Sequence, residues 1–398
     1  MDPSQAILAS HSDRVLLARR RYFEDGVLPT GVVSDAVFQS WNRCHRASHE
    51  PHRSVQFQPV SASRSQLSLQ KNRALHEAWL GELPAIGSAL GATNCSAILT
   101  DASGVLIGAT PSIRPGLKVT PIAHRLGVNL SEDLVGTTAP GLVLRTGKQE
   151  CVLGPEHFYE SVSGMHCTAA PIRNLHGQLA GILDISCEGL RFHFDPVTVV
   201  GLYAASIENR LLVAQAAQHF IVRFQFMPAM VDTPVAGMLG FDESGCLVWV
   251  NSMASSLLRL PFNPVERERH TLEDIFEMTA PQMRLLADGQ LCEVRLTNGP
   301  HVHIRCEAPR VVTSMASVTA VTAASKGGPS LATPEETVLD GYLPPSSLRD
   351  ADADLIRKCL AECHGNVSKV ARKLKVSRGL IYRRLRELSI DPGHFKAR

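Results

Sequence analysis

The chain has 398 residues, of which 44% are hydrophobic and 20% are charged, a composition typical of a folded protein rather than a disordered one. This length predicts two to four domains. Basic residues gather near the C-terminal end. Residues 365–398 hold ten Lys or Arg and two acidic residues, a net charge of +8, so the rest carries −6 against a total of +2.

Export and membrane insertion are not expected from the sequence. No run reaches the ~18 consecutive apolar residues of a membrane span, and the first 23 residues lack the basic start and apolar core of a signal peptide. The ten cysteines are scattered without paired spacing, which indicates reduced thiols. We therefore expect a cytoplasmic protein with no membrane partner.

Residues 1–70 predict a polar, helical N-terminal arm. "SDAVFQSWNRCHRA" has helical apolar spacing at Val37, Phe38, Trp41 and Cys44, with Ser34 as its cap. After a break containing two prolines, "LSLQKNRALHEAWLGELPAIGSALG" predicts a second helix.

Residues 71–220 predict an α+β domain around an antiparallel sheet. "CSAILTDASGVLIGA" and "HCTAAPIRNLHGQLAGILDISCE" each predict a strand, a turn and a second strand. A long helix follows, capped by Asp195 with Pro196 at its first position. Its apolar stripe fits either a dimer seam or a helix that covers its own sheet; the stripe contains Val200, Tyr203, Ile207 and Leu211.

Residues 226–310 predict a second, smaller α+β module. It begins with "GMLGFDESGCLVWVN" and ends with the hairpin "LCEVRLTNGPHVHIRCE", in which His301 and His303 share one strand face. Residues 311–347 are small, polar and punctuated by Gly and Pro, as in a flexible linker.

Residues 348–392 predict three short amphipathic helices. Asn366 caps the second, Ser377 caps the third, and the small Ala371 permits close crossing. A short turn between the last two helices makes this a helix-turn-helix. The predicted inward-facing residues are Leu355, Cys359, Leu360, Val367, Val370, Leu374, Ile381, Leu385 and Leu388.

The stretch "GNVSKVARKLKVSRGLIYRRLRE" resembles the Fis-type helix-turn-helix over 23 residues, with Lys375 where that family often has Gly. The resemblance implies double-stranded DNA as a partner and a homodimer. We expect Ser377 and Arg378 at base edges. The residues expected along the groove or on phosphates are Lys369, Arg372, Leu380, Arg383, Arg384 and Arg386.

The N-terminal part resembles the sensor of acetoin-catabolism-type regulators, which are relatives of sigma-54 activators. The matching stretches are "SWNRC" (40–44), Asn129 with "GTTA" (136–139), "GPEHF" (154–158) and "CTAAPI" (167–172). The resemblance implies a GAF-like sensor, and residues 226–310 resemble a PAS module with Asn251 at its usual Asn position. These activators carry an ATPase motor between sensor and DNA-binding domain, yet the 311–347 span holds no Gly-x4-Gly-Lys-Ser/Thr loop.

The sensor domain is the candidate ligand site, because small-molecule pockets are largely apolar with few polar groups. The polar candidates are Thr137, Thr138, Glu156, His157 and His166. Dimerisation without a ligand is the alternative role. Catalysis by a Cys167–His157 pair lacks an orienting third group, so we expect no enzyme.

No cofactor or metal is expected. Cys359, Cys363 and His364 have no partner cluster with zinc spacing. The sequence therefore predicts a DNA-binding transcription regulator that responds to a small-molecule effector or to a partner such as RNA polymerase or another regulator. The alternative is a sensor that acts mainly by binding another regulator.

Overall fold

The computed structural model describes residues 10–111, 116–297, 299–310 and 366–373, together with Leu360, Ile381 and Leu385. Internal contacts divide the chain into two units, Met1–Ala316 and Ser317–Arg398, which are described separately. The predicted linker 311–347 and the Cys359, Cys363 and His364 triplet lie outside the described residues.

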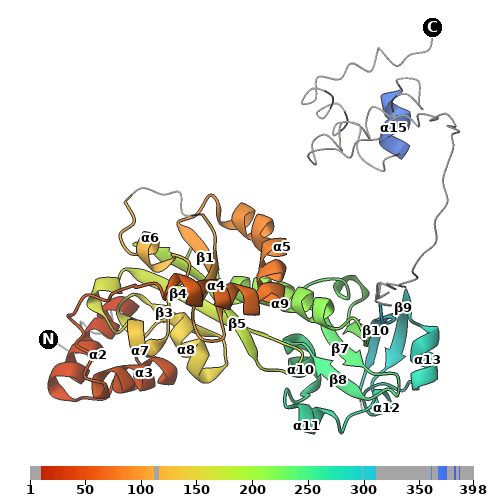
Figure 1. The fold of residues 1–398 in the computed structure, drawn as a ribbon, viewed down its shortest axis with the longest axis horizontal. Helices are drawn as coiled ribbons and strands as arrows, with labels where there is room; N and C mark the ends of the chain where they lie inside the picture. The colour runs from red at the N-terminus through yellow and green to blue at the C-terminus, as the bar shows by residue number, and fades with distance from the viewer. Residues whose placement is uncertain are drawn as a thin grey trace, which may run out of the picture. The chain divides into compact units, whose positions relative to one another are not determined.

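The first unit contains two antiparallel sheets (Figure 1). The first sheet has strand order β2-β1-β5-β4-β3. Its strands are β1 (Cys95–Asp101), β2 (Leu106–Ala109), β3 (Glu150–Leu153), β4 (Met165–Arg173) and β5 (Leu179–Glu188). The two hairpins expected from the sequence are present, because β1 pairs with β2 and β4 pairs with β5.

One face of this sheet is covered by α5 (Arg73–Leu90) and α9 (Pro196–Gln215). Val200, Ile207 and Leu211 of α9 pack in the core with Leu183 and Ile185 of β5. The apolar stripe predicted on this helix therefore covers its own sheet, and Asp195 caps the helix as expected. Among the described helices, α9 alone has the length and composition of a membrane span, but this buried stripe makes it a core helix.

The other face is covered by N-terminal helices and by short helices inserted between the strands. The N-terminal ones are α2 (His11–Asp25) and α3 (Asp35–Arg46). The inserted ones are α6 (Thr120–Ala123), α7 (Glu132–Val135) and α8 (Ala139–Thr146). Val15, Val37 and Trp41 share one core with Ile98 and Cys167 of the sheet. The helices of the predicted N-terminal arm thus complete the core of the first sheet.

The predicted helix from residue 67 to residue 91 is interrupted. α4 (Ala62–Lys71) ends at Asn72, and α5 begins after it. Asn72 leaves helical geometry, with φ −105° and ψ 25°, and its side-chain amide donates to the Ser68 carbonyl oxygen at 2.9 Å. Asn is favoured at such helix ends, so the break has a local cause.

The second sheet has strand order β8-β7-β6-β10-β9. Its strands are β6 (Phe220–Gln225), β7 (Gly237–Phe241), β8 (Leu247–Val250), β9 (Asp288–Arg295) and β10 (His301–Glu307). The helices α10 (Ser252–Leu258), α11 (Pro264–Arg267), α12 (Leu272–Ile275) and α13 (Ala280–Leu285) lie between β8 and β9. Both hairpins that the sequence predicted here, β7–β8 and β9–β10, are formed.

A buried polar network joins α9 of the first sheet region to the second sheet region. Glu208 accepts hydrogen bonds from the backbone N–H groups of Arg173 at 2.8 Å and Ser252 at 2.6 Å, and from the Ser252 hydroxyl at 3.0 Å. Asn251 caps α10 and donates to the Asn209 side-chain oxygen at 2.8 Å. These bonds fix the start of α10 against α9.

The second unit is described through α15 (Val367–Lys373) and three single residues. Asn366 caps this helix, accepting from the Ser368 N–H at 3.1 Å and the Lys369 N–H at 3.2 Å, as the sequence predicted. The predicted inward positions that are described are all buried: Leu360, Val367, Val370, Ile381 and Leu385. Ala371, predicted at the helix crossing, is buried as well.

The hydrogen bonds between α9 and α10 predict that two capping asparagines, Asn251 and Asn263, contribute unequally to stability. Asn251→Ala removes a helix cap and the hydrogen-bond partners of the buried Met238 N–H and of the Asn209 side-chain oxygen, so we expect a loss of roughly 3 kcal/mol in unfolding free energy. Asn263→Ala removes only the cap of α11 and should cost about 1 kcal/mol. Urea unfolding of both variants measures the difference, and equal losses would contradict the role of Asn251.

Candidate ligand pocket and nucleic-acid interface

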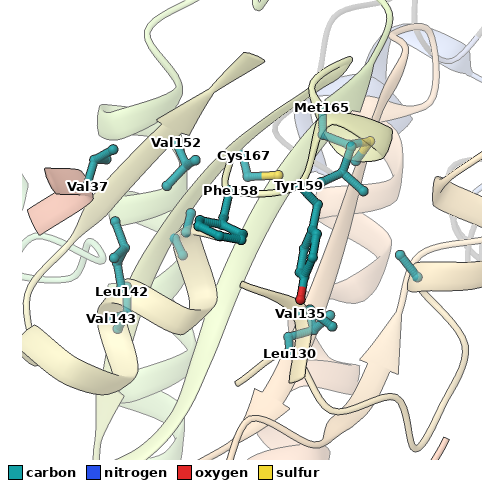
Figure 2. Packing of buried hydrophobic residues seen from close by; sticks show 14 of the residues in the cluster. Val37, Leu130, Val135, Leu142, Val143, Val152, Phe158, Tyr159, Met165 and Cys167 are labelled. Carbon is teal, nitrogen blue, oxygen red and sulfur yellow. The ribbon is translucent and has the colours of Figure 1, made fainter. Parts of the chain in front are cut away.

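A small cavity of about 40 Å³ lies between the first sheet and the short helices that cover it. Strand alternation places Ile98 of β1, Cys167 of β4, and Asp184 and Ser186 of β5 on this face. In the strand register Asp184 stands opposite Ile98, and Ser186 stands opposite Cys167. Figure 2 shows Met165 and Cys167 of β4 with Phe158, Tyr159 and Leu130 in the core that surrounds this cavity.

Apolar side chains form most of the wall. The apolar lining residues are Phe57, Ile98, Val119, Ala123, Leu130, Pro140, Val162 and Met165. The other lining residues are His124, Thr138, His157, Cys167, Asp184 and Ser186. Such an apolar wall with a few convergent polar groups is typical of small-molecule sites.

Asp184 is a buried carboxyl with an incomplete set of partners. It is 1% exposed, and the Ser186 hydroxyl donates to its Oδ2. Its Oδ1 is buried without a hydrogen-bond partner among the described residues. Burial raises the pKa of Asp184 to about 7, and the hydrogen bond from Ser186 opposes that rise. The carboxyl can therefore be charged or neutral near neutral pH.

His157 has a defined tautomer. Its Nδ1 lies 2.9 Å from the Gly154 carbonyl oxygen, which can only accept, so Nδ1 carries the proton. Burial lowers the pKa of His157 to about 4, so the ring is neutral. Its Nε2 is then an acceptor, and it is buried without a partner in the described part of the chain.

The N-terminal helices hold the loop that carries His157. Arg19 of α2 donates to the His157 carbonyl oxygen at 2.7 Å and to that of Phe158. Trp41 of α3 donates from Nε1 to the Glu156 carbonyl oxygen at 2.7 Å. The position of His157 therefore depends on both helices.

A second histidine enters the cavity wall from the segment around α6. His124 Nδ1 lies 3.1 Å from the Ser96 hydroxyl, and burial lowers the pKa of His124 to about 4. The segment is anchored by Glu188, which accepts from the backbone N–H groups of Lys118 at 2.7 Å and Thr120 at 2.9 Å.

The five ligand candidates chosen from the sequence fall into two groups. Thr138 and His157 line the cavity. Thr137, Glu156 and His166 are not among its lining residues. Thr137 lies 2.7 Å from the Ser40 hydroxyl, and Glu156 accepts from the Leu153 N–H at 2.7 Å. These two side chains hold the loops around the cavity together.

Sequence reasoning missed Asp184 and Ser186, although "LAGILDISCE" carried a signal. In a strand that is otherwise apolar, an Asp and a Ser two residues apart must share one face. Buried carboxyls are rare unless they are paired or functional.

Cys167 and His157 line the same cavity, but their protonation does not favour nucleophilic chemistry. Burial raises the pKa of the Cys167 thiol well above its usual value, with Asp184 adding to the effect. The thiolate is the reactive form of cysteine, so this thiol is inert as a nucleophile. His301 and His303 share the more exposed face of β10, and no metal-ligand cluster occurs among the described residues.

The DNA-binding candidates are described only in part. Lys369 and Arg372 are exposed on α15, opposite buried Val367 and Val370. Ser377, Arg378, Leu380, Arg383, Arg384 and Arg386 lie outside the described residues.

Two protein families match this chain. Residues 13–208 match the family described as "MimR, N-terminal domain", and residues 347–388 match "Bacterial regulatory protein, Fis family". The second match covers the helix-turn-helix expected from the sequence.

Relatives with assigned roles are bacterial transcription regulators rather than enzymes. The acetoin catabolism regulatory protein of Cupriavidus necator is 28% identical over 62% of this chain and 38% of its own length. The acetoin dehydrogenase operon transcriptional activator of Bacillus subtilis is 28% identical over 52% of this chain and 34% of its own. Thus the chain matches little more than a third of each relative's length.

A solved structure with limited similarity is the Escherichia coli DhaR(N)–DhaL complex. It is 13% identical, with a TM-score of 0.44, over 69% of this chain and 100% of the matched chain.

The raised pKa of Asp184 predicts a pH-dependent cost of burial. A carboxyl whose pKa is higher in the folded state is tolerated at low pH, and stability is lost as pH rises through the folded value of about 7. Asp184→Asn removes this loss. As the pH rises from 5 to 8, we expect the unfolding free energy of the variant to increase by roughly 2 to 3 kcal/mol relative to that of the unmodified protein.

Thermal unfolding across that pH range measures the effect. His124, His157 and Cys167 face the same cavity and are present in both proteins, so their titration largely cancels in the difference. The control is Asp133→Asn, which neutralises an exposed carboxyl in a surface ion pair with Arg145 and should change the unfolding free energy by less than about 1 kcal/mol. A flat difference for Asp184→Asn would contradict its raised pKa.

Proposed function

Because this chain is related to the bacterial transcription regulators of the acetoin-catabolism type, we propose that it is a sequence-specific DNA-binding regulator whose sheet-containing region senses a small molecule or a partner. The Fis-family match over residues 347–388 carries this proposal. The net charge of +8 over residues 365–398 supports it, because attraction to phosphate supplies much of DNA affinity.

The DNA-facing surface is proposed to include α15 and the segment after it. On α15, Lys369 and Arg372 are exposed while Val367, Val370 and Ala371 are buried, which favours phosphate contacts from this helix. We propose Ser377 and Arg378 at base edges in the major groove. The further contacts proposed are those of Leu380, Arg383, Arg384 and Arg386.

We propose the GAF type for the first sheet region and the PAS type for the second. The first has a five-stranded antiparallel sheet with long helices on one face and a cavity on the other. The second has a five-stranded sheet with short helices between β8 and β9. The acidic remainder of the chain would disfavour contact between these regions and DNA.

The mode of action is proposed to differ from that of an ATP-driven activator. Residues 311–347 between the second sheet region and the helix-turn-helix contain no phosphate-binding loop. The protein would then act in the cytoplasm as a homodimer on a two-fold DNA site. It would repress, assist another activator or contact RNA polymerase directly.

A second candidate function is a sensor that acts by binding another regulator. The match of residues 13–208 to a regulator's N-terminal domain favours it, because this match is separate from the Fis-family match at residues 347–388. Deleting residues 345–398 separates the two in cells. Loss of regulation supports the DNA-binding function, and retained regulation supports the second.

Arginine substitutions test the DNA-binding function in the full chain. Arg372→Ala should weaken binding to all duplexes and reduce the log–log salt slope by about 1, as expected for one phosphate contact. Arg378→Ala should cost about 1–3 kcal/mol on a selected DNA site and relax selectivity at one base pair.

Fluorescence anisotropy with DNA selected from a random library measures both effects. The control is Arg64→Ala, which removes an exposed arginine from α4. If the unmodified chain fails to bind duplex DNA at low salt, or if all three variants behave alike, the DNA-binding function is wrong.

A further inference from the structure

Two residues that line the same apolar cavity each carry a buried polar atom with no hydrogen-bond partner among the described residues. They are Asp184, 1% exposed, with its Oδ1, and His157, 2% exposed, with its Nε2. Leaving such an atom buried and unpaired costs about 1–3 kcal/mol each. Two of them on one cavity indicate that a bound molecule completes their hydrogen bonds.

We propose that this cavity is the effector site and that it takes a small, uncharged molecule with at least one hydroxyl group, bound by His157 and Asp184. The proposal deepens the sensing role given above and rests on it. It names the chemical class of the effector and the two atoms that recognise it.

His157 selects for a hydroxyl donor. Its Nδ1–H is already used by the Gly154 carbonyl, at 2.9 Å, so the free Nε2 can only accept. A ketone, ether or hydrocarbon has no proton to offer it. A hydroxyl has one, and its oxygen can still accept a hydrogen bond.

Asp184 can pair with a hydroxyl compound as an acceptor or as a donor of a hydrogen bond. Because Ser186 donates to Oδ2, the partner must satisfy Oδ1. Ionised, Oδ1 accepts from a second hydroxyl; protonated, it donates to a hydroxyl or carbonyl oxygen. A diol or a hydroxyketone satisfies both unpaired atoms at once.

The wall of the cavity disfavours charged ligands. Its lining residues within the described part of the chain include no Lys or Arg, so a carboxylate or phosphate would lose its hydration without gaining a cation. An ammonium would likewise have to give up its hydration in a mostly apolar cavity, whereas a neutral hydroxyl compound pairs with Asp184 Oδ1 and His157 Nε2 without the desolvation of an ion.

The size of the cavity limits the ligand to a few non-hydrogen atoms. Its volume is about 40 Å³, and one water needs ~10–15 Å³ on such a scale. The cavity therefore holds a molecule of roughly three to six non-hydrogen atoms. A ligand of this size gains at most about 1.5 kcal/mol per non-hydrogen atom, so weak binding is expected.

Four probes of similar size test the proposal on the full chain. Propane-1,2-diol has two hydroxyls, and its isomer dimethoxymethane has the same atoms but no O–H donor. 1-Aminopropan-2-ol replaces one hydroxyl with an ammonium group, and lactate carries a carboxylate. We expect the diol to bind at least tenfold more tightly than the other three in ligand-observed NMR titrations.

Matched variants assign the binding to the cavity. His157→Phe removes the acceptor, with His166→Phe as the same change at a residue that does not line the cavity. Asp184→Val removes both the donor and the acceptor of this side chain at similar size, with Asp133→Val as the same change at an exposed position. We expect at least a tenfold loss of diol affinity in His157→Phe and Asp184→Val and no change in the controls. If His157→Phe fails to fold, Asp184→Val carries the test alone.

The outcomes separate this proposal from the regulator function. If the chain binds DNA but no probe binds, if the ether or a charged probe binds best, or if Asp184→Val and Asp133→Val behave alike, the proposed effector class is wrong. If the diol binds with the expected variant effects and DNA binding fails, the site stands and the DNA-binding function is wrong.

Discussion

The burial of Asp184 in the middle of β5 is the constraint on which the first sheet region depends. Its neighbours Leu183 and Ile185 face the core under α5 and α9, so the strand cannot turn over without driving a carboxyl into that apolar layer. Asp184 and Ser186 must therefore face the other side, where α6 to α8 and the N-terminal helices lie. The alternation of side chains along β5 thus places apolar residues in one core and polar residues against the cavity.

A comparison with Glu208 separates the ligand-binding role proposed for Asp184 from the structural role of a buried carboxyl. Both carboxyls are buried, and burial raises the pKa of each. Glu208 accepts three hydrogen bonds from Arg173 and Ser252, which is the usual role of a buried acid at a structural joint. Asp184 receives one hydrogen bond among the described residues, from its neighbour Ser186, and keeps an unpaired oxygen beside a cavity.

The elements of the fold were predictable because they are locally encoded. Turn residues between apolar runs marked the hairpins β1–β2 and β4–β5, and Asp195 followed by Pro196 marked the start of α9. The cavity was harder to predict, because it depends on residues far apart in the chain. His157 was found from its motif, but its Nε2, unpaired among the described residues, follows from a turn in which the Gly154 carbonyl oxygen accepts the hydrogen bond from Nδ1–H. Thr137 and Glu156 belong to the same motifs, but their side chains hydrogen-bond to Ser40 and to the Leu153 N–H instead of lining the cavity.

The same contacts indicate how the cavity is coupled to the rest of the first unit. Cys167 lines the cavity near the start of β4, and Arg173 at the end of that strand donates its backbone N–H to Glu208 on α9. Glu208 in turn holds the N–H and hydroxyl of Ser252, the first residue of α10 in the second sheet region. One strand and one buried carboxylate thus connect the cavity floor to the next sheet. Because packed cores shift between discrete arrangements rather than deforming smoothly, a ligand that moves β4 has a short and continuous path to α10.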